Sequence, residues 1–121
     1  MKKLLLFVLV IISAKYSFCQ TLTPDEAAKH VGDKVKVCGK IFGGRFFETS
    51  NNAPTLLNMG AAFPASPITI VIYKELRTKM GYSPETQLKD KNVCVTGTVT
   101  LHKEKPQIVI TDASQLEISE K

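Results

Sequence analysis

The chain has 121 residues, a length that supports one domain with one modest core. Its 16 basic and 11 acidic residues give a formal net charge of +5, but three of the lysines lie within residues 1–19. Without that segment 13 basic and 11 acidic residues remain. A net charge of +2 excludes a strong overall electrostatic attraction to nucleic acid or to an anionic membrane. It does not exclude a local basic patch.

The first 19 residues have the organisation of a secretory signal peptide. Lys2 and Lys3 form a basic start, an uninterrupted apolar run covers residues 4–12, and the residues before Gln20 suit cleavage at that position. The apolar run is shorter than the roughly 20 residues that a membrane-spanning helix needs. We therefore predict an exported protein, periplasmic or secreted, whose mature part, residues 20–121, forms one domain without a membrane span.

Cys19 leaves an alternative open at this end of the chain. A cysteine at the cleavage site is also the residue that is lipidated in lipoproteins. Lipoprotein signals place a small residue immediately before that cysteine, whereas this chain has Phe18. Simple cleavage therefore remains the expectation.

The mature chain begins with a short predicted helix. Thr23 can cap it, Pro24 suits its first position, and Glu26 completes a capping box. We expect the helix to run as far as His30 and to stop at Gly32.

Apolar runs then predict the strands. The first covers residues 35–42, and Gly43 and Gly44 follow as a flexible break or a bulge, beyond which residues 46–49 can continue the strand. The run at 68–73 is apolar almost throughout, which is typical of a central strand. Further predicted elements are a strand at 55–59, a loop at 60–67, a helix at 74–80, a turn at 83–85 and a short tail strand at 116–118.

An antiparallel hairpin is predicted near the end of the chain. Its turn is expected at residues 102–105 and its returning strand at 108–110. The first strand alternates strictly, with threonines and Cys94 on one face. The other face holds apolar residues and one glycine: Val93, Val95, Gly97, Val99 and Leu101.

Four segments carry a resemblance to a known fold: VKVCGKI at 35–41, TLLNMG at 55–60, ITIVIY at 68–73 and NVCVTGTVTLHKEKPQIVITDASQLEI at 92–118. Their order, with a helix between the third and fourth strands, resembles the OB-fold, an all-β, five-stranded Greek-key barrel with short helices. The chain is similar to small exported single-domain OB-fold proteins. It also resembles nucleic-acid-binding OB-fold modules of the tRNA anticodon-binding and nuclease-associated types, without the catalytic part of a nuclease.

This resemblance implies a binding surface. OB-folds bind oligonucleotides across their second and third strands, between the loops that join strands one to two and four to five. Single-strand binders combine stacking aromatic rings with a basic groove, and Arg45, Phe46 and Phe47 supply both beside two glycines. The contact residues that the resemblance implies are Lys40, Arg45, Phe46, Phe47, Asn58, Tyr73, His102, Lys103 and Lys105.

An ordinary structural role is the competing interpretation of the same residues. Phe46 and Phe47 point to opposite faces of an extended strand, so one of them is expected in the core. Phe42 and Tyr73 are expected to be packed as well. Glu104 offsets part of the positive charge of the lysines in its turn, and the turn is then an ordinary solvated turn.

The two cysteines of the mature domain are Cys38 and Cys94. Each alternates with inward-facing valines, so both are expected to point away from the barrel interior. Export places them in an oxidising compartment, where a disulfide can form if their strands are neighbours. Two reduced cysteines that serve as small strand residues are the alternative.

No catalytic motif is recognisable in the sequence. Cys38 lacks an adjacent base, and His30 and His102 have no partner at zinc-ligand spacing. We therefore expect no enzyme activity, no metal and no cofactor. Two hypotheses remain: an exported module that binds single-stranded DNA or RNA or a similar oligoanion, and a periplasmic scaffold or binding protein for a protein, peptide or small ligand.

Overall fold

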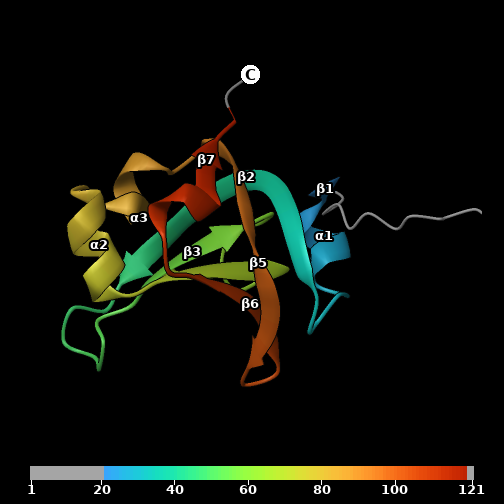
Figure 1. Ribbon diagram of the computed structural model, residues 1–121, viewed down its shortest axis with the longest axis horizontal. Coiled ribbons are helices and arrows are strands. Elements are labelled where there is room, and N and C mark those ends of the chain that lie inside the picture. Colours follow the sequence, from blue (N-terminus) through green and yellow to red (C-terminus); the bar gives the residue numbers. More distant parts are fainter. Residues whose placement is uncertain (1–20, 120–121) are drawn as a thin grey trace, which may run out of the picture.

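Five long strands wrap into a closed barrel with short helices around it (Figure 1). The computed structural model describes residues 21–119, so the predicted signal peptide, its cleavage before Gln20 and the lipidation alternative at Cys19 lie outside the described residues. The elements in chain order are β1 (Thr21–Leu22), α1 (Pro24–Ala27), β2 (Lys34–Phe46), β3 (Thr55–Met59), β4 (Ile68–Ile72), α2 (Lys74–Met80), α3 (Pro84–Gln87), β5 (Asn92–His102), β6 (Lys105–Ile110), η1 (Ala113–Gln115) and β7 (Leu116–Ile118).

The barrel follows the order β2, β3, β4, β6 and β5, and it closes because β5 also pairs with β2. β4 and β6 are parallel, whereas the other neighbours in the barrel are antiparallel. β1 is a two-residue addition beside β2, so the third and fourth strands of the barrel are β4 and β5, and α2 lies between them. This topology confirms the predicted OB-fold-like barrel and the place of its helix.

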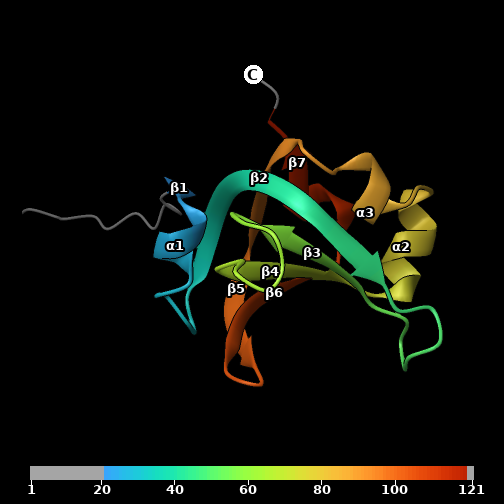
Figure 2. The same cartoon turned by 180° about the vertical axis from the view of Figure 1, so that it is seen from behind.

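β2 is long enough to pair with two different strands along its length. Its first part, residues 34–40, pairs with β5, and from Ile41 onward it pairs with β3. Figure 2 shows the strand as an arch over β3 and β4. The strand ends at Phe46, not at Thr49, because the chain turns away at Glu48 and Thr49.

A bulge interrupts the pairing of β2 with β3. Phe42 and Gly43 together oppose the single residue Asn58. Gly43 has a φ of +121°, a conformation that favours glycine. The predicted break is therefore a bulge within one continuous strand. The register pairs that flank it are Ile41 with Met59 and Gly44 with Leu57.

The interior of the barrel is filled by alternate residues of the strands and by Leu88 from the segment that follows α3. Leu101, which the alternation assigned to the same face of β5, is instead 53% exposed. It lies near the end of the hairpin, opposite Pro106 and beyond the core. Side chains at most 1% exposed include Val37, Ile41, Leu57, Met59, Ile68, Ile70, Ile72, Leu88, Val93, Val95, Val99, Ile108 and Ile110.

The helices are short. The capping box of α1 is confirmed, since Thr23 Oγ1 accepts from the Glu26 amide at 3.2 Å and Glu26 Oε1 accepts from the Thr23 amide at 3.0 Å. α1 ends at Ala27, earlier than expected, and turns follow it. α2 has the predicted bounds and ends at Gly81, whose φ is +77°. Within residues 21–119, no helix is long and apolar enough to cross a membrane.

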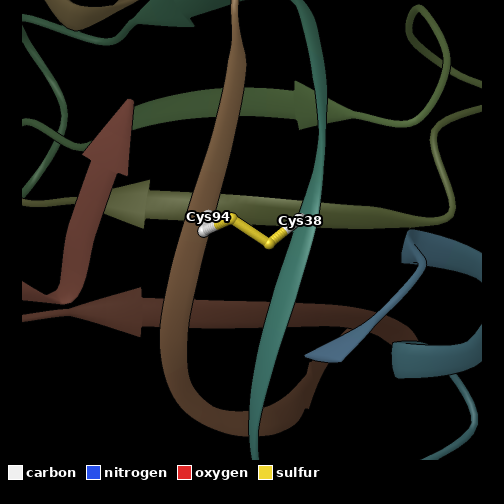
Figure 3. The surroundings of a disulfide bond; sticks show 2 residues. All are labelled: Cys38 and Cys94. Carbon is white, nitrogen blue, oxygen red and sulfur yellow. A yellow bond between two sulfur atoms is a disulfide. The ribbon is translucent and has the colours of Figure 1, made fainter. Parts of the chain in front are cut away.

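Cys38 and Cys94 form a disulfide between β2 and β5 (Figure 3). The two residues are direct partners in the antiparallel register. Their neighbours Val37, Val93 and Val95 are fully buried in the barrel, so the bond lies on the opposite side of these strands. Of the two alternatives for these cysteines, the structure has the disulfide, which is typical of proteins in oxidising compartments.

The β5–β6 hairpin closes on the predicted turn. His102 pairs with Lys105, and the two residues between them, Lys103 and Glu104, have φ values of +54° and +69°. Positive φ at both central positions is the geometry of a type I′ turn, in which asparagine and glycine are preferred. The turn therefore has the expected place but holds two residues that rarely adopt this conformation.

Candidate functional site

The outer face of β3, β4 and β6 carries two rows of side chains. In one row the register pairs Asn58 with Thr69 and Thr69 with Gln107, all three partly exposed and able to form hydrogen bonds. The next row is apolar and pairs Leu56, Val71 and Val109 in the same way. Leu56 and Val109 are partly exposed, whereas Val71 between them is 2% exposed, so the polar row is the one that offers hydrogen-bonding groups to a ligand.

A hollow of about 190 Å³ opens at one side of this face. Arg45 lies above the ring of Phe47, with its guanidinium carbon 5.2 Å from the ring centre, in cation–π geometry. The two residues share this face because they are two apart in an extended chain. The residues that line this central hollow are Gly44, Arg45, Phe47, Leu56, Asn58 and Phe63.

Phe63 stands on the loop between β3 and β4 and is 76% exposed. It also lines a second hollow of about 250 Å³, here called the turn hollow, which reaches the β5–β6 turn. Phe63 is thus shared by the two hollows. The other residues that line the turn hollow are Pro64, Ser66, Thr69, Glu104, Lys105 and Pro106.

Four of the residues implied by the resemblance come together on this surface. Arg45, Phe47 and Asn58 line the central hollow, and Lys105 lines the turn hollow. His102 and Lys103 are exposed in the adjoining turn. Phe63 was not among the residues predicted from the sequence, because an isolated aromatic residue in a loop has no periodicity to mark it. Its flanking glycine and prolines indicated a loop and nothing more.

Phe46 faces a different environment from Phe47. The guanidinium of Arg77 lies 3.6 Å from the centre of the Phe46 ring. Phe46 pairs with the fully buried Thr55, whereas Arg45 pairs with Leu56 on the outer face. The expectation of opposite faces is confirmed, although both rings are partly exposed and neither is fully in the core.

Arg77 on α2 holds the last residue of β2 and the first residue of β3 against the helices. Its guanidinium donates to Thr55 Oγ1 at 2.7 Å, to both carboxylate oxygens of Glu85 at 2.7 and 3.2 Å, and to Ser83 Oγ at 3.2 Å. The hydrogen bond from Arg77 holds the pKa of Glu85 below its usual 4.5, against the opposing effect of burial. These contacts fix the strand that presents Arg45 and Phe47.

Tyr73 and Lys40 line neither of the two hollows. Tyr73 follows β4 and lines a separate hollow of about 520 Å³ with Asn52, Lys74 and Lys79. Lys40 lies over the ring of Phe42 at 5.0 Å. Phe42 and Tyr73 are each 37% exposed, so the expectation that they are packed in the core is wrong.

Two side chains that could act as a base, Glu104 and His102, lie at the turn end of this surface. Among residues 21–119, no three His, Cys, Asp or Glu residues are grouped so that they could hold a metal ion. His30 contacts Asp33 at 3.2 Å at the opposite end of β2 from Arg45. The arrangement is suited to binding an extended ligand by stacking, hydrogen bonds and ion pairs.

No protein-family model matches the chain, and no curated protein matches it in sequence. Solved structures match its fold. A structure described as an aspartyl-tRNA synthetase from Leishmania major matches over 94% of this chain and 23% of its own, with a TM-score of 0.57 and 12% identity. RecG bound to a three-way DNA junction matches over 84% of this chain and 13% of its own, with a TM-score of 0.58 and 18% identity.

A third match is an isolated domain. The OBody AM1L10, solved bound to hen egg-white lysozyme, is covered over its whole length and matches 89% of this chain, with a TM-score of 0.54 and 13% identity. The chain spans less than a quarter of the first two proteins, and all three identities are low. These matches show an OB-fold-like barrel.

Proposed function

We propose that this protein is an exported, non-catalytic module that binds single-stranded nucleic acid, or a similar oligoanion, across the outer face of β3 and β4. The observation that carries the proposal is the Arg45–Phe47 pair, which lines the central hollow together with the exposed ring of Phe63. Stacked aromatic rings beside cations are the recurrent chemistry of single-strand binding.

The shape of the face supports an extended ligand. The central and turn hollows have volumes of about 190 and 250 Å³, below the roughly 300–1,000 Å³ of pockets that enclose a small molecule. They share Phe63, so a chain can cross both. Bases would stack on Phe47 and Phe63, Arg45 and Lys105 would contact phosphates, and the row from Asn58 to Gln107 would meet base edges.

The structural matches support the proposed nucleic-acid binding, and the disulfide supports the proposed export. The matched proteins include one named as a tRNA synthetase and one solved on a DNA junction, so barrels of this shape occur in proteins that act on nucleic acid. The Cys38–Cys94 disulfide supports the exported location, periplasmic or secreted, because disulfides persist in oxidising compartments.

A protein or peptide partner is the second candidate for the same face. Two observations favour it: Phe63 is a 76% exposed apolar side chain, and the matched OBody binds lysozyme with a barrel of this kind. The predicted mature charge of +2 also weakens long-range attraction to nucleic acid. The two candidates differ in salt dependence: for a ligand held through phosphates, the slope of log K against log salt follows the number of phosphates contacted.

The experiment is a fluorescence anisotropy titration of residues 20–121, which include all of the described fold, against labelled single-stranded DNA and RNA. Binding should weaken strongly between about 50 and 200 mM salt. Arg45→Ala with Phe47→Ala should reduce affinity, whereas Lys29→Ala, an equal loss of charge in the turns after α1, should not. Unchanged affinity in the double variant would contradict this location of the site.

A further inference from the structure

A second cation–aromatic pair lies on β2 outside the central hollow. Lys40 Nζ is 5.0 Å from the centre of the Phe42 ring, and the ring is 37% exposed. The pair repeats the spacing of Arg45 and Phe47, since in each case the aromatic residue follows its cation by two positions. Both cations and Phe42 are exposed, so β2 and the residue that follows it present two similar pairs in succession.

The bulge in β2 places this second pair next to the central hollow. Phe42 and Gly43 oppose Asn58, which itself lines the hollow. Side chains of directly opposed residues in an antiparallel pair have Cβ atoms roughly 5 Å apart. Phe42 therefore lies across the strand pair from Asn58, the first residue of the polar row.

Two further lysines lie along the other edge of β2. The segment before β5 is held beside Ile41, because the Asp90 amide donates to the Ile41 carbonyl at 2.7 Å and the Ile41 amide donates to the Lys91 carbonyl at 2.9 Å. The side chain of Lys89 reaches the bulge, where its Cε is the nearest atom, at 4.0 Å, to the position that a Cβ of Gly43 would take.

We propose that this surface, the β2 extension (Lys40, Phe42, Lys89 and Lys91), continues the path of a bound single strand from the central hollow over the bulge toward the segment before β5. The inference rests on the proposed function. Phe42 stacks one further base, and the three exposed lysines contact phosphates, with Asp90 as the acidic residue among them. The path is longer than the β3–β4 face alone.

The test compares two oligonucleotide lengths, about 4 and about 12 nucleotides, both within the range of site sizes known for single OB-folds. The variants are Phe42→Ala and the double variant Lys89→Ala with Lys91→Ala. The matched control is Lys29→Ala with Lys34→Ala, which removes the same charge from exposed positions at the other end of β2. Far-ultraviolet circular dichroism verifies folding, and the lysine variant carries the test if Phe42→Ala does not fold.

We expect wild-type protein to bind the longer oligonucleotide more tightly. Phe42→Ala should weaken that binding at least about fivefold. The lysine variant should reduce the slope of log K against log salt by about 1.4. Binding of the short oligonucleotide should change little in either. Equal effects on both lengths, or no effect on the longer one, would overturn the extension while leaving the proposed function standing. Failure of wild-type protein to bind either length would overturn the proposed function itself.

Discussion

The guanidinium of Arg77 covers the ring of Phe46, 3.6 Å from its centre, while it donates hydrogen bonds to Thr55 and Glu85. One side chain of α2 thus holds the last residue of β2, the first residue of β3 and the start of α3. Thr55 is fully buried, and Arg77 Nη1 is the donor to its hydroxyl. The strand that presents Arg45 and Phe47 to solvent depends on this arrangement.

Arg77→Met should destabilise the protein by about 3 kcal/mol, because it leaves the Glu85 carboxylate and the buried Thr55 hydroxyl without their partner. Urea denaturation measures this loss. Arg45→Met is the matched control: Arg45 is exposed, so its loss should change stability by no more than about 0.5 kcal/mol. Equal effects of the two substitutions would contradict the structural role of Arg77.

The Arg77–Glu85 pair should also make stability depend on pH. The folded state holds the pKa of Glu85 below its usual 4.5, so the pair stabilises the protein above that pH. This contribution is lost as the pH falls through the lower pKa of the folded state. Glu85→Gln should therefore lower the melting temperature at about pH 6 and have a progressively smaller effect toward about pH 3. A constant difference across that range would argue against the ion pair.

The Cys38–Cys94 disulfide joins residues 56 apart in the sequence. Closing a loop of that length in the unfolded chain corresponds to about 4 kcal/mol of stabilisation in the chain-entropy model. Replacing both cysteines by alanine should reduce the free energy of unfolding by an amount of that order, measured by urea denaturation. A reductant should destabilise wild-type protein and leave the variant unchanged. A reductant that affects both equally would show that the cysteines are not paired.

A substitution in the Lys103–Glu104 turn should raise the stability of the protein. Glu104 has a φ of +69°, which costs a residue with a β-carbon about 1 kcal/mol, whereas glycine adopts it freely. Glu104→Gly should raise stability by about that amount, and Glu104→Ala, which keeps the β-carbon, should not. Thermal unfolding of the two variants distinguishes them. If both stabilise equally, relief of charge and not of backbone strain would be the cause.

Phe63 should contribute to binding and little to stability. Its side chain is 76% exposed, so Phe63→Ala should leave the melting temperature nearly unchanged while weakening binding of a single strand by about 1–3 kcal/mol. Ile118→Ala is the control, because Ile118 is a 50% exposed apolar residue on β7, which pairs with β5 and not with β3 or β4. Equal binding by wild type and Phe63→Ala would remove Phe63 from the interface.

Much of the fold could be predicted because its signals are local. The strand at Thr55–Met59 and the helix at Lys74–Met80 have the bounds that their apolar spacing and the terminating Gly81 indicate. The opposed cysteines follow from alternation together with the pairing of β2 and β5. Leu101 departs from the pattern because alternation fixes a face of the strand and says nothing about how far the core extends.

The parts of the site that could not be predicted from the sequence depend on contacts between residues that are not neighbours in the chain. Arg77 is 22 residues from Thr55 and 8 from Glu85, and no local pattern marks a helical arginine as the partner of a buried hydroxyl. Alternation places Phe46 and Phe47 on opposite faces but does not say which ring lies in the central hollow and which lies under Arg77. Phe63 joins the site through the return of its loop across β3, where Ser66 Oγ lies 3.5 Å from Asn58 Oδ1.

The most direct test of the account is the salt dependence of binding between residues 20–121 and a labelled single strand of about 12 nucleotides. We predict a slope of log K against log salt of about −2 or steeper, reduced in size by about 0.7 in Arg45→Ala. No binding at about 50 mM salt by folded protein, or binding that salt does not weaken, would contradict a phosphate-contacting face and favour a protein, peptide or small-ligand partner.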